Sequence, residues 1–138
     1  MTLGLSNTPM MSKKASFSLE SAYETCRKET AQWAKTFYLG TLLLPPVKRR
    51  AIWAIYVWCR RTDELMDSPE AMKLPVEELA NRLDLWEERT KAIFDGRIED
   101  GLDAVMTDTF KRFPQSIQPY LDMIEGQRMD LNKTRYAT

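Results

Sequence analysis

The sequence predicts an all-α domain, built as an antiparallel helical bundle. Three observations support this fold class. Apolar residues recur at helical spacing through most of the chain after Ser18. Glycines and prolines fall mainly between these periodic segments, as expected for helices joined by short turns. No stretch of useful length alternates apolar and polar residues as a strand would, and we find no internal repeat or glycine-rich phosphate loop.

Composition narrows the class of protein further. The 138 residues suffice for one domain or part of a larger one, and a hydrophobic content of 43% supports a core. Lys+Arg and Asp+Glu each number 20, so no net charge favours nucleic acid as a partner. The absence of histidine excludes His-based triads and His-ligated zinc. We expect Cys26 and Cys59 to be small buried hydrophobes rather than a disulfide.

The chain shows no targeting or membrane-spanning pattern. No apolar run approaches the roughly 20 residues that cross a bilayer. Residues 1–17 lack the apolar core of a signal peptide, and we expect them to form a disordered leader before a helical domain over residues 18–138. We expect a cytoplasmic protein, or one peripheral on a membrane, in a plastid if the source is eukaryotic.

The first two predicted helices are bounded by clear signals. Ser18 can cap a first helix, which should end near residues 38–40. Pro46 suits the first position of a second helix. That helix should run to Asp67, because Ser68-Pro69 follows as a stop signal.

Three further periodic segments, of which the fourth helix is the shortest, complete the predicted bundle. Pro75 begins a third helix, and Gly96 is a plausible end to it. A fourth helix covers residues 102–113 and is ended by Pro114. Pro119 opens a fifth, which continues toward the end of the sequence. The prediction is therefore five helices in antiparallel succession with short connections.

The second helix carries an unusual polar stripe. Tyr56, Arg60, Asp63 and Asp67 stand at i, i+4, i+7 and i+11, so they share one narrow face of an otherwise mostly apolar helix. Such a helix should be buried around most of its circumference, with the acidic stripe facing an enclosed polar site. Two carboxylates one turn apart repel each other there unless a cation neutralises them.

The stripe has two structural interpretations and one functional interpretation. Acidic pairs at this spacing are common on solvated helix faces, and Arg60 could simply pair with Asp63. Alternatively, carboxylates on one face hold Mg²⁺, which keeps positions for waters and phosphate oxygens. Arg60 and Arg61 would then contact the phosphate. A metal and diphosphate site at the mouth of an apolar cavity is typical of enzymes that act on prenyl diphosphates.

At these residues the chain resembles a known family. WAIYVWCRRTDELMD, residues 53–67, resembles the first aspartate-rich motif of the squalene/phytoene synthase family. The longer block TFYLGTLLLPPVKRRAIWAIYVWCRRTDELMD and the later FPQSIQPYLDMIEGQRMDL and RY resemble its cyanobacterial and plant phytoene synthase branch. The similarity runs from about Ser18 to Thr138, in several separated blocks that agree in order.

The resemblance implies an activity. Members of that branch are all-α isoprenoid synthases, which join two geranylgeranyl diphosphates through prephytoene diphosphate to give phytoene in carotenoid biosynthesis. They are prenyltransferases that use Mg²⁺, with Mn²⁺ as an alternative ion. The sequence ends before the family's second aspartate-rich helix, so it resembles the N-terminal part of the isoprenoid synthase domain. We expect this part to be inactive by itself.

The resemblance also implies roles for individual residues. Asp63 and Asp67 would bind Mg²⁺, with Glu64 as a supporting acidic ligand. Arg60 and Tyr56 match positions that contact the diphosphate. Further positions implied to approach the substrate are Lys35, Thr36, Phe37 and Asp130.

Aromatic residues near these positions have two interpretations. The faces of Phe37 and Tyr56 could stabilise an allylic cation. The competing interpretation for Phe37 is ordinary helix packing, and for Trp33, Trp53 and Trp58 packing is the role that we expect.

Two other functions remain open at this stage. One is a squalene or dehydrosqualene synthase that uses farnesyl diphosphate, and the other is a noncatalytic helical binding module. The sequence leaves the oligomeric state open.

Overall fold

The computed structural model describes residues 19–136, with side chains up to residue 133. This part of the chain contains no strand, so the all-α prediction is confirmed. Each of its helices is too short or too polar to cross a bilayer. The predicted cap Ser18 and the leader lie outside the described residues. The helices are residues 19–33 (the first helix), α2 (Lys35–Thr41), α3 (Pro46–Asp67), the 3-10 turn η1 (Ala71–Lys73), α4 (Val76–Phe94), α5 (Gly101–Arg112) and α6 (Gln118–Tyr136).

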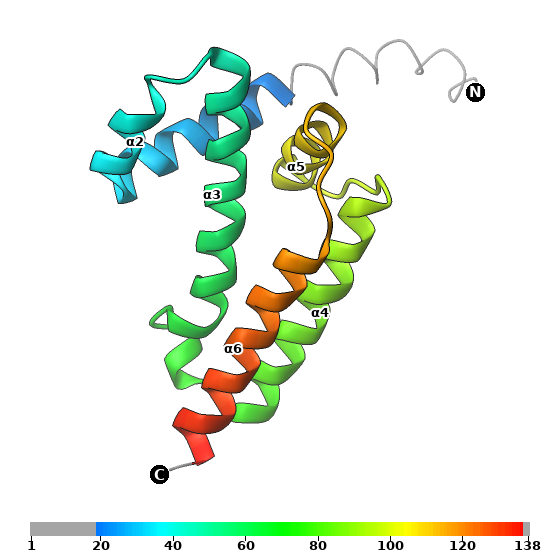
Figure 1. The fold of residues 1–138 in the computed structure, drawn as a ribbon. Helices are drawn as coiled ribbons and strands as arrows, with labels where there is room; N and C mark the ends of the chain where they lie inside the picture. The colour runs from blue at the N-terminus through cyan, green and yellow to red at the C-terminus, as the bar shows by residue number, and fades with distance from the viewer. Residues whose placement is uncertain (1–18, 137–138) are drawn as a thin grey trace, which may run out of the picture.

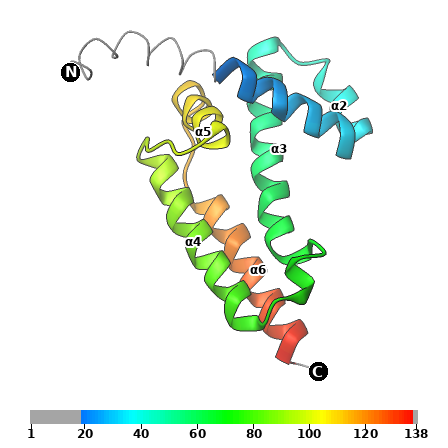
Figure 2. The ribbon, with the colours of Figure 1, turned by 180° about the vertical axis from the view of Figure 1, so that it is seen from behind.

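Three long helices form the body of the molecule. In Figure 1, α4 runs antiparallel to both α3 and α6, and α4 lies beside α6 along its length. The first helix and α5 lie across one end of α3, as the reverse view in Figure 2 also shows. The predicted antiparallel order therefore applies to α3, α4 and α6, while the first helix and α5 cross the end of the group.

Helix boundaries follow the proline and glycine signals closely. Pro46 is the first residue of α3, and Pro75 is the N-cap of α4. Gly96 follows α4 with a positive φ of 85°, a conformation that glycine adopts without steric cost. Asp100 caps α5 by accepting a hydrogen bond from the backbone N–H of Asp103 at 3.1 Å.

The prediction of one continuous helix up to residues 38–40 is wrong. Ala34 leaves the helical conformation, with φ −141° and ψ 64°, and α2 begins anew after it. Tertiary contacts with α3 explain the break. The Tyr38 ring stacks on Trp53 with centroids 5.7 Å apart, and Thr41 Oγ1 accepts a hydrogen bond from Trp53 Nε1 at 2.8 Å. A straight continuation would not bring both residues of α2 onto the same indole.

A reciprocal Trp–Thr pair joins α3 to α4 in the core. Trp58 Nε1 on α3 donates to Thr90 Oγ1 on α4 at 3.3 Å, and Trp86 Nε1 on α4 donates to Thr62 Oγ1 on α3 at 2.8 Å. The two indoles stack with centroids 6.0 Å apart. All four residues are buried, so each indole N–H has the partner that burial demands. This contact fixes which side of α3 faces inward.

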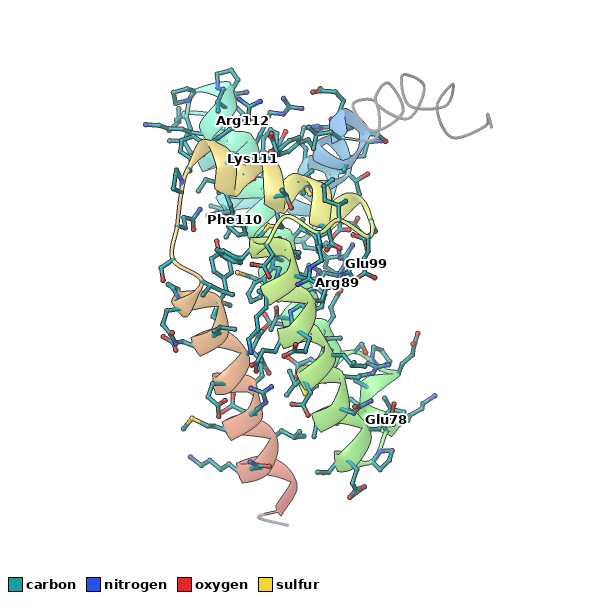
Figure 3. All side chains as sticks on the ribbon, turned by 90° about the vertical axis from the view of Figure 1, so that its right-hand side faces the viewer. Glu78, Arg89, Glu99, Phe110, Lys111 and Arg112 are labelled. Atoms are coloured by element: carbon teal, nitrogen blue, oxygen red, sulfur yellow. The ribbon has the colours of Figure 1, made fainter. Side chains whose placement is uncertain are left out.

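A buried carboxylate fastens α5 to the end of α4. Asp103 is 1% exposed, and its Oδ1 accepts a hydrogen bond from Arg89 Nε at 3.0 Å. Its Oδ2 accepts from the backbone N–H of Glu99 at 2.9 Å, and Arg89 also pairs with Asp100. Figure 3 shows Arg89 on α4 close to Glu99 in the connection. The buried charge is thus compensated by a cation and a backbone donor.

Both cysteines are free thiols, as predicted. Burial raises the pKa of the Cys26 thiol to about 12, and it also raises the pKa of the half-buried Cys59. Because the thiolate is the reactive form, neither residue is a candidate nucleophile.

Candidate functional site

The acidic end of the α3 stripe, Asp63 and Asp67, faces α6. Gln127 Nε2 on α6 donates a hydrogen bond to Asp63 Oδ1 at 2.9 Å. One turn further along α3, Asp67 lines a hollow of about 310 Å³ together with Asp130 of α6. We call this the α3–α6 hollow, and its walls are Met66, Asp67, Met72, Leu79, Gln127, Asp130 and Leu131.

The acidic stripe is exposed rather than enclosed. Asp63 and Asp67 both present their side chains to solvent, so the expectation of an enclosed polar site is wrong for the described residues. The pKa of Asp63 is nevertheless raised. Partial burial is the main cause, and the charge of Asp67 adds to it, while Arg60 and the Gln127 hydrogen bond act in the opposite direction. The two carboxylates therefore repel each other across one helical turn.

This donor set suits a hard divalent cation. Carboxylate oxygens are the ligands that Mg²⁺ prefers, and Mg²⁺ usually takes one or two of them and fills its other positions with waters and phosphate oxygens. Asp63 and Asp67 supply such a pair, and a bound cation would relieve the repulsion that raises the pKa of Asp63. Among the residues that the structure describes, no three acidic or thiol side chains gather closely enough to form a complete metal site.

Glu64 lies apart from that pair. Its Oε2 is 3.2 Å from Arg60 Nε, and its Oε1 is 3.7 Å from Arg61 Nη1. Glu64 and Arg61 line a second hollow of about 370 Å³, on whose wall Asp63 and Asp67 are absent. The structure thus pairs Glu64 with arginines instead of bringing it to the α3–α6 hollow.

Arg60 is held by an aromatic face rather than by a hydrogen bond. Its guanidinium lies 3.8 Å from the centroid of a Trp33 ring, a cation–π contact between α3 and the first helix. Arg60 Nε is buried and has no hydrogen-bond partner among the described residues, because the nearby Glu64 oxygen is poorly aligned with it. Trp33 and Glu64 therefore fix the position of the Arg60 guanidinium.

Trp33 does not pack in the core. It is 54% exposed, whereas Trp53 and Trp58 are buried as expected. The helical spacing places Trp33 on the apolar stripe of the first helix. The contact depends on how the first helix packs against α3, so the sequence carried no signal of it.

The neighbouring Arg61 is committed elsewhere. Its two terminal nitrogens donate to both carboxylate oxygens of Glu29 on the first helix, at 2.7 and 2.9 Å. These hydrogen bonds are the main cause of the raised pKa of Arg61. A substrate phosphate would have to compete with Glu29 for this guanidinium.

The start of α2 approaches the same face of α3. The rings of Phe37 and Tyr56 have centroids 5.8 Å apart, and Phe37 remains 47% exposed. Lys35 and Thr36, which precede Phe37, are also exposed. The structure therefore places an aromatic ring, a cation and two carboxylates along about three turns of α3, with the Phe37 ring of α2 beside the first of them.

Comparisons with known proteins identify the family of the chain. The family model described as "Squalene/phytoene synthase" matches residues 30–138. The 15-cis-phytoene synthase of Synechocystis sp. is 58% identical over 130 residues, which cover 94% of this chain and 37% of the relative. The phytoene synthase of Arthrospira platensis is 54% identical over 136 residues, covering 99% of this chain and 42% of the relative.

A plant relative gives the same result. Phytoene synthase 2, chloroplastic, of Solanum lycopersicum is 57% identical over 118 residues, covering 86% of this chain and 37% of the relative. The chain thus spans about two fifths of the length of these three relatives. The family match covers most of the chain, including α3 and its polar stripe, and we conclude that the chain belongs to the squalene/phytoene synthase family.

Proposed function

We propose that the chain supplies the first aspartate-rich part of a phytoene synthase, a Mg²⁺-dependent prenyltransferase that joins two geranylgeranyl diphosphates. The main support is the α3 stripe. Asp63 and Asp67 share one face with Arg60 and Tyr56, beside a hollow that Asp130 also lines, in a chain similar to phytoene synthases.

Each residue of the stripe has a distinct part in the proposal. Asp63 and Asp67 would hold Mg²⁺ (or Mn²⁺), which when bound neutralises charge on the departing diphosphate. Arg60, whose guanidinium lies over Trp33 and pairs with Glu64, would donate to a diphosphate oxygen and stabilise the charge that develops as the C–O bond ionises.

Other residues would act on the hydrocarbon part of the substrate. The faces of Phe37 and Tyr56 would lie beside the allylic carbons and exclude water from the cation. Lys35 and Thr36 at the start of α2 would approach the diphosphate from the other side of the aromatic pair. Glu64 would contribute through Arg60 and Arg61, to which it is paired.

The test is a hybrid protein in which this chain is continued by the C-terminal remainder of the Synechocystis relative. With Mg²⁺ and radiolabelled geranylgeranyl diphosphate, the hybrid should form phytoene. The double variant Asp63→Asn plus Asp67→Asn should lower kcat/KM by at least about 100-fold, comparable to the loss of one preorganised electrostatic group.

Controls separate chemistry from folding. Asp95→Asn plus Glu99→Gln removes two exposed carboxylates in the connection between α4 and α5, away from the α3 stripe, and should leave the rate unchanged. Undiminished phytoene formation by the Asp63 and Asp67 double variant would reject the metal assignment. Turnover of farnesyl diphosphate in preference to geranylgeranyl diphosphate would instead indicate the squalene or dehydrosqualene synthase alternative.

The 138-residue chain alone should form no phytoene. Asp63 and Asp67 face solvent, so an ionising allylic diphosphate there would be captured by water. A peripheral position at a membrane is part of this proposal, because the product is a lipid-soluble hydrocarbon. Co-sedimentation of the hybrid with lipid vesicles would test it.

A further inference from the structure

Gln127 makes a polar contact with the α3 stripe across the bundle. Its Nε2 donates to Asp63 Oδ1 at 2.9 Å, although the two residues are 64 positions apart in the chain. Gln127 is half-buried and also lines the α3–α6 hollow together with Asp67 and Asp130. The amide therefore contacts one carboxylate of the stripe and stands next to the other.

Packing fixes the direction in which Gln127 points. Ile124 and Leu131 lie three residues before it and four residues after it, and both are buried. The next residue, Arg128, pairs with Glu87 and Asp84 of α4 at 2.6 and 2.9 Å. Helix α6 is thus anchored on both sides of Gln127, which presents this amide to Asp63 of α3.

The contact opposes the tendency of the two carboxylates to separate. An exposed Asp63 side chain free to rotate would turn away from Asp67, because like charges one turn apart repel. The amide holds Oδ1 and leaves Oδ2 available. Being uncharged, it orients the carboxylate without neutralising it, whereas a lysine or arginine in its place would compete with a cation for the same charge.

From this geometry we propose that Gln127 is a positioning residue, which holds the Asp63 carboxylate so that Asp63 and Asp67 offer oxygens to one divalent cation. The inference rests on the proposed function of those two aspartates. It adds α6 to the metal site as the element that orients a ligand of α3. Partners that orient metal ligands in this way affect metal affinity more than they affect the fold.

The variant Gln127→Met tests the proposal. Methionine keeps the length and flexibility of glutamine but cannot donate a hydrogen bond. The matched control is Gln118→Met, because Gln118 Nε2 donates in the same way to Asp122 on α6 at 2.8 Å, a contact made within one helix. Mn²⁺ binding by the 138-residue chain, with inorganic diphosphate present, is followed by the electron paramagnetic resonance signal of free Mn²⁺.

We expect Gln127→Met to weaken Mn²⁺ binding by about 10-fold, and Gln118→Met to leave it unchanged. In the hybrid, Gln127→Met should raise the Mg²⁺ concentration needed for half-maximal rate by a similar factor, while kcat at saturating Mg²⁺ recovers most of its value. A merely structural role would lower kcat at every Mg²⁺ concentration.

Two failures are distinguishable. If the wild-type chain binds Mn²⁺ through Asp63 and Asp67 and Gln127→Met binds it equally well, the positioning role is wrong and the metal site stands. If Asp63→Asn plus Asp67→Asn leaves Mn²⁺ binding and phytoene formation intact, the proposed function fails, and the inference fails with it. The side-chain amide resonances of Gln127 add a separate check, since Asp63→Ala must shift them if the hydrogen bond exists in solution.

Discussion

The two sides of α3 differ in how completely their polar groups are satisfied. On the side toward α4, the reciprocal Trp–Thr pair buries two indoles and gives each N–H an acceptor. On the side toward α6, Asp63 and Asp67 are exposed and repel each other. One face of α3 therefore fixes the helix against α4. The other face carries exposed, mutually repelling carboxylates that remain able to bind a ligand, as functional sites commonly do.

The largest expected effect comes from the buried side. Trp58→Ala should lower the free energy of unfolding by about 3–5 kcal/mol, because it removes a fully buried indole and leaves a cavity. Trp33→Ala is the matched control, since the same substitution at a residue that is 54% exposed should cost much less. Urea denaturation of the 138-residue chain measures both. Similar losses for the two variants would show that the sides of α3 do not differ in this way.

A smaller effect tests the Thr62 hydroxyl, which accepts from Trp86 and also donates to the backbone carbonyl of Trp58 at 2.9 Å. Thr62→Val keeps the shape of the side chain but removes the acceptor for Trp86 Nε1, and should cost about 1–3 kcal/mol because a buried donor loses its partner. Thr107→Val serves as the control. The Thr107 hydroxyl is buried and has no hydrogen-bond partner within the described residues, so its removal should be neutral or stabilising. Thermal unfolding of both variants would reveal equal losses if the hydrogen bond were unimportant.

The contact between Trp33 and Arg60 should contribute about 0.5–1 kcal/mol, as exposed cation–π contacts do. Trp33→Leu should therefore destabilise the chain slightly and abolish the ring-current shift of the Arg60 Nε proton in NMR spectra. Trp33→Phe keeps an aromatic face and should retain part of that shift. An Arg60 resonance at its unstacked position in the wild-type chain would contradict the contact.

The smallest effect has the opposite sign. A raised folded-state pKa means that ionised Asp63 destabilises the fold, and this penalty is present above the folded pKa and vanishes as pH falls below the unfolded value of about 3.9. Asp63→Asn should thus stabilise the chain by about 0.3 kcal/mol at neutral pH, the scale of a like-charge pair one turn apart.

The gain from Asp63→Asn should disappear when unfolding is measured in acid. At neutral pH the ionised Asp63 carboxylate would thus oppose stability while serving metal binding. A loss of stability at neutral pH would mean that Asp63 supports the fold, and that the two sides of α3 are alike in this respect.

Helix boundaries could be predicted from the sequence where a proline or a glycine sets the end of the helix. Pro46, Pro75 and Gly96 mark boundaries of α3 and α4 close to their observed positions. The break at Ala34 escaped prediction, because alanine is the best helix former and the cause is the docking of α2 on Trp53.

The candidate site could be predicted only in part, for a similar reason. The spacing of Asp63 and Asp67 on one face follows from helix geometry. Spacing cannot say which adjacent carboxylate finds an arginine, so the pairing of Glu64 with Arg60 was not foreseen. The partner of Asp63, Gln127, lies on another helix and became visible only in the fold.

The reciprocal Trp–Thr pair also sets the axial register of α3 against α4. In both helices the tryptophan and the threonine are one turn apart, and each indole reaches across to the other helix's hydroxyl. Sliding α4 by a single residue, about 1.5 Å, would misalign both bonds together. The same two hydrogen bonds therefore fix the axial position of Asp63 and Asp67, which follow Thr62 on α3, relative to α4.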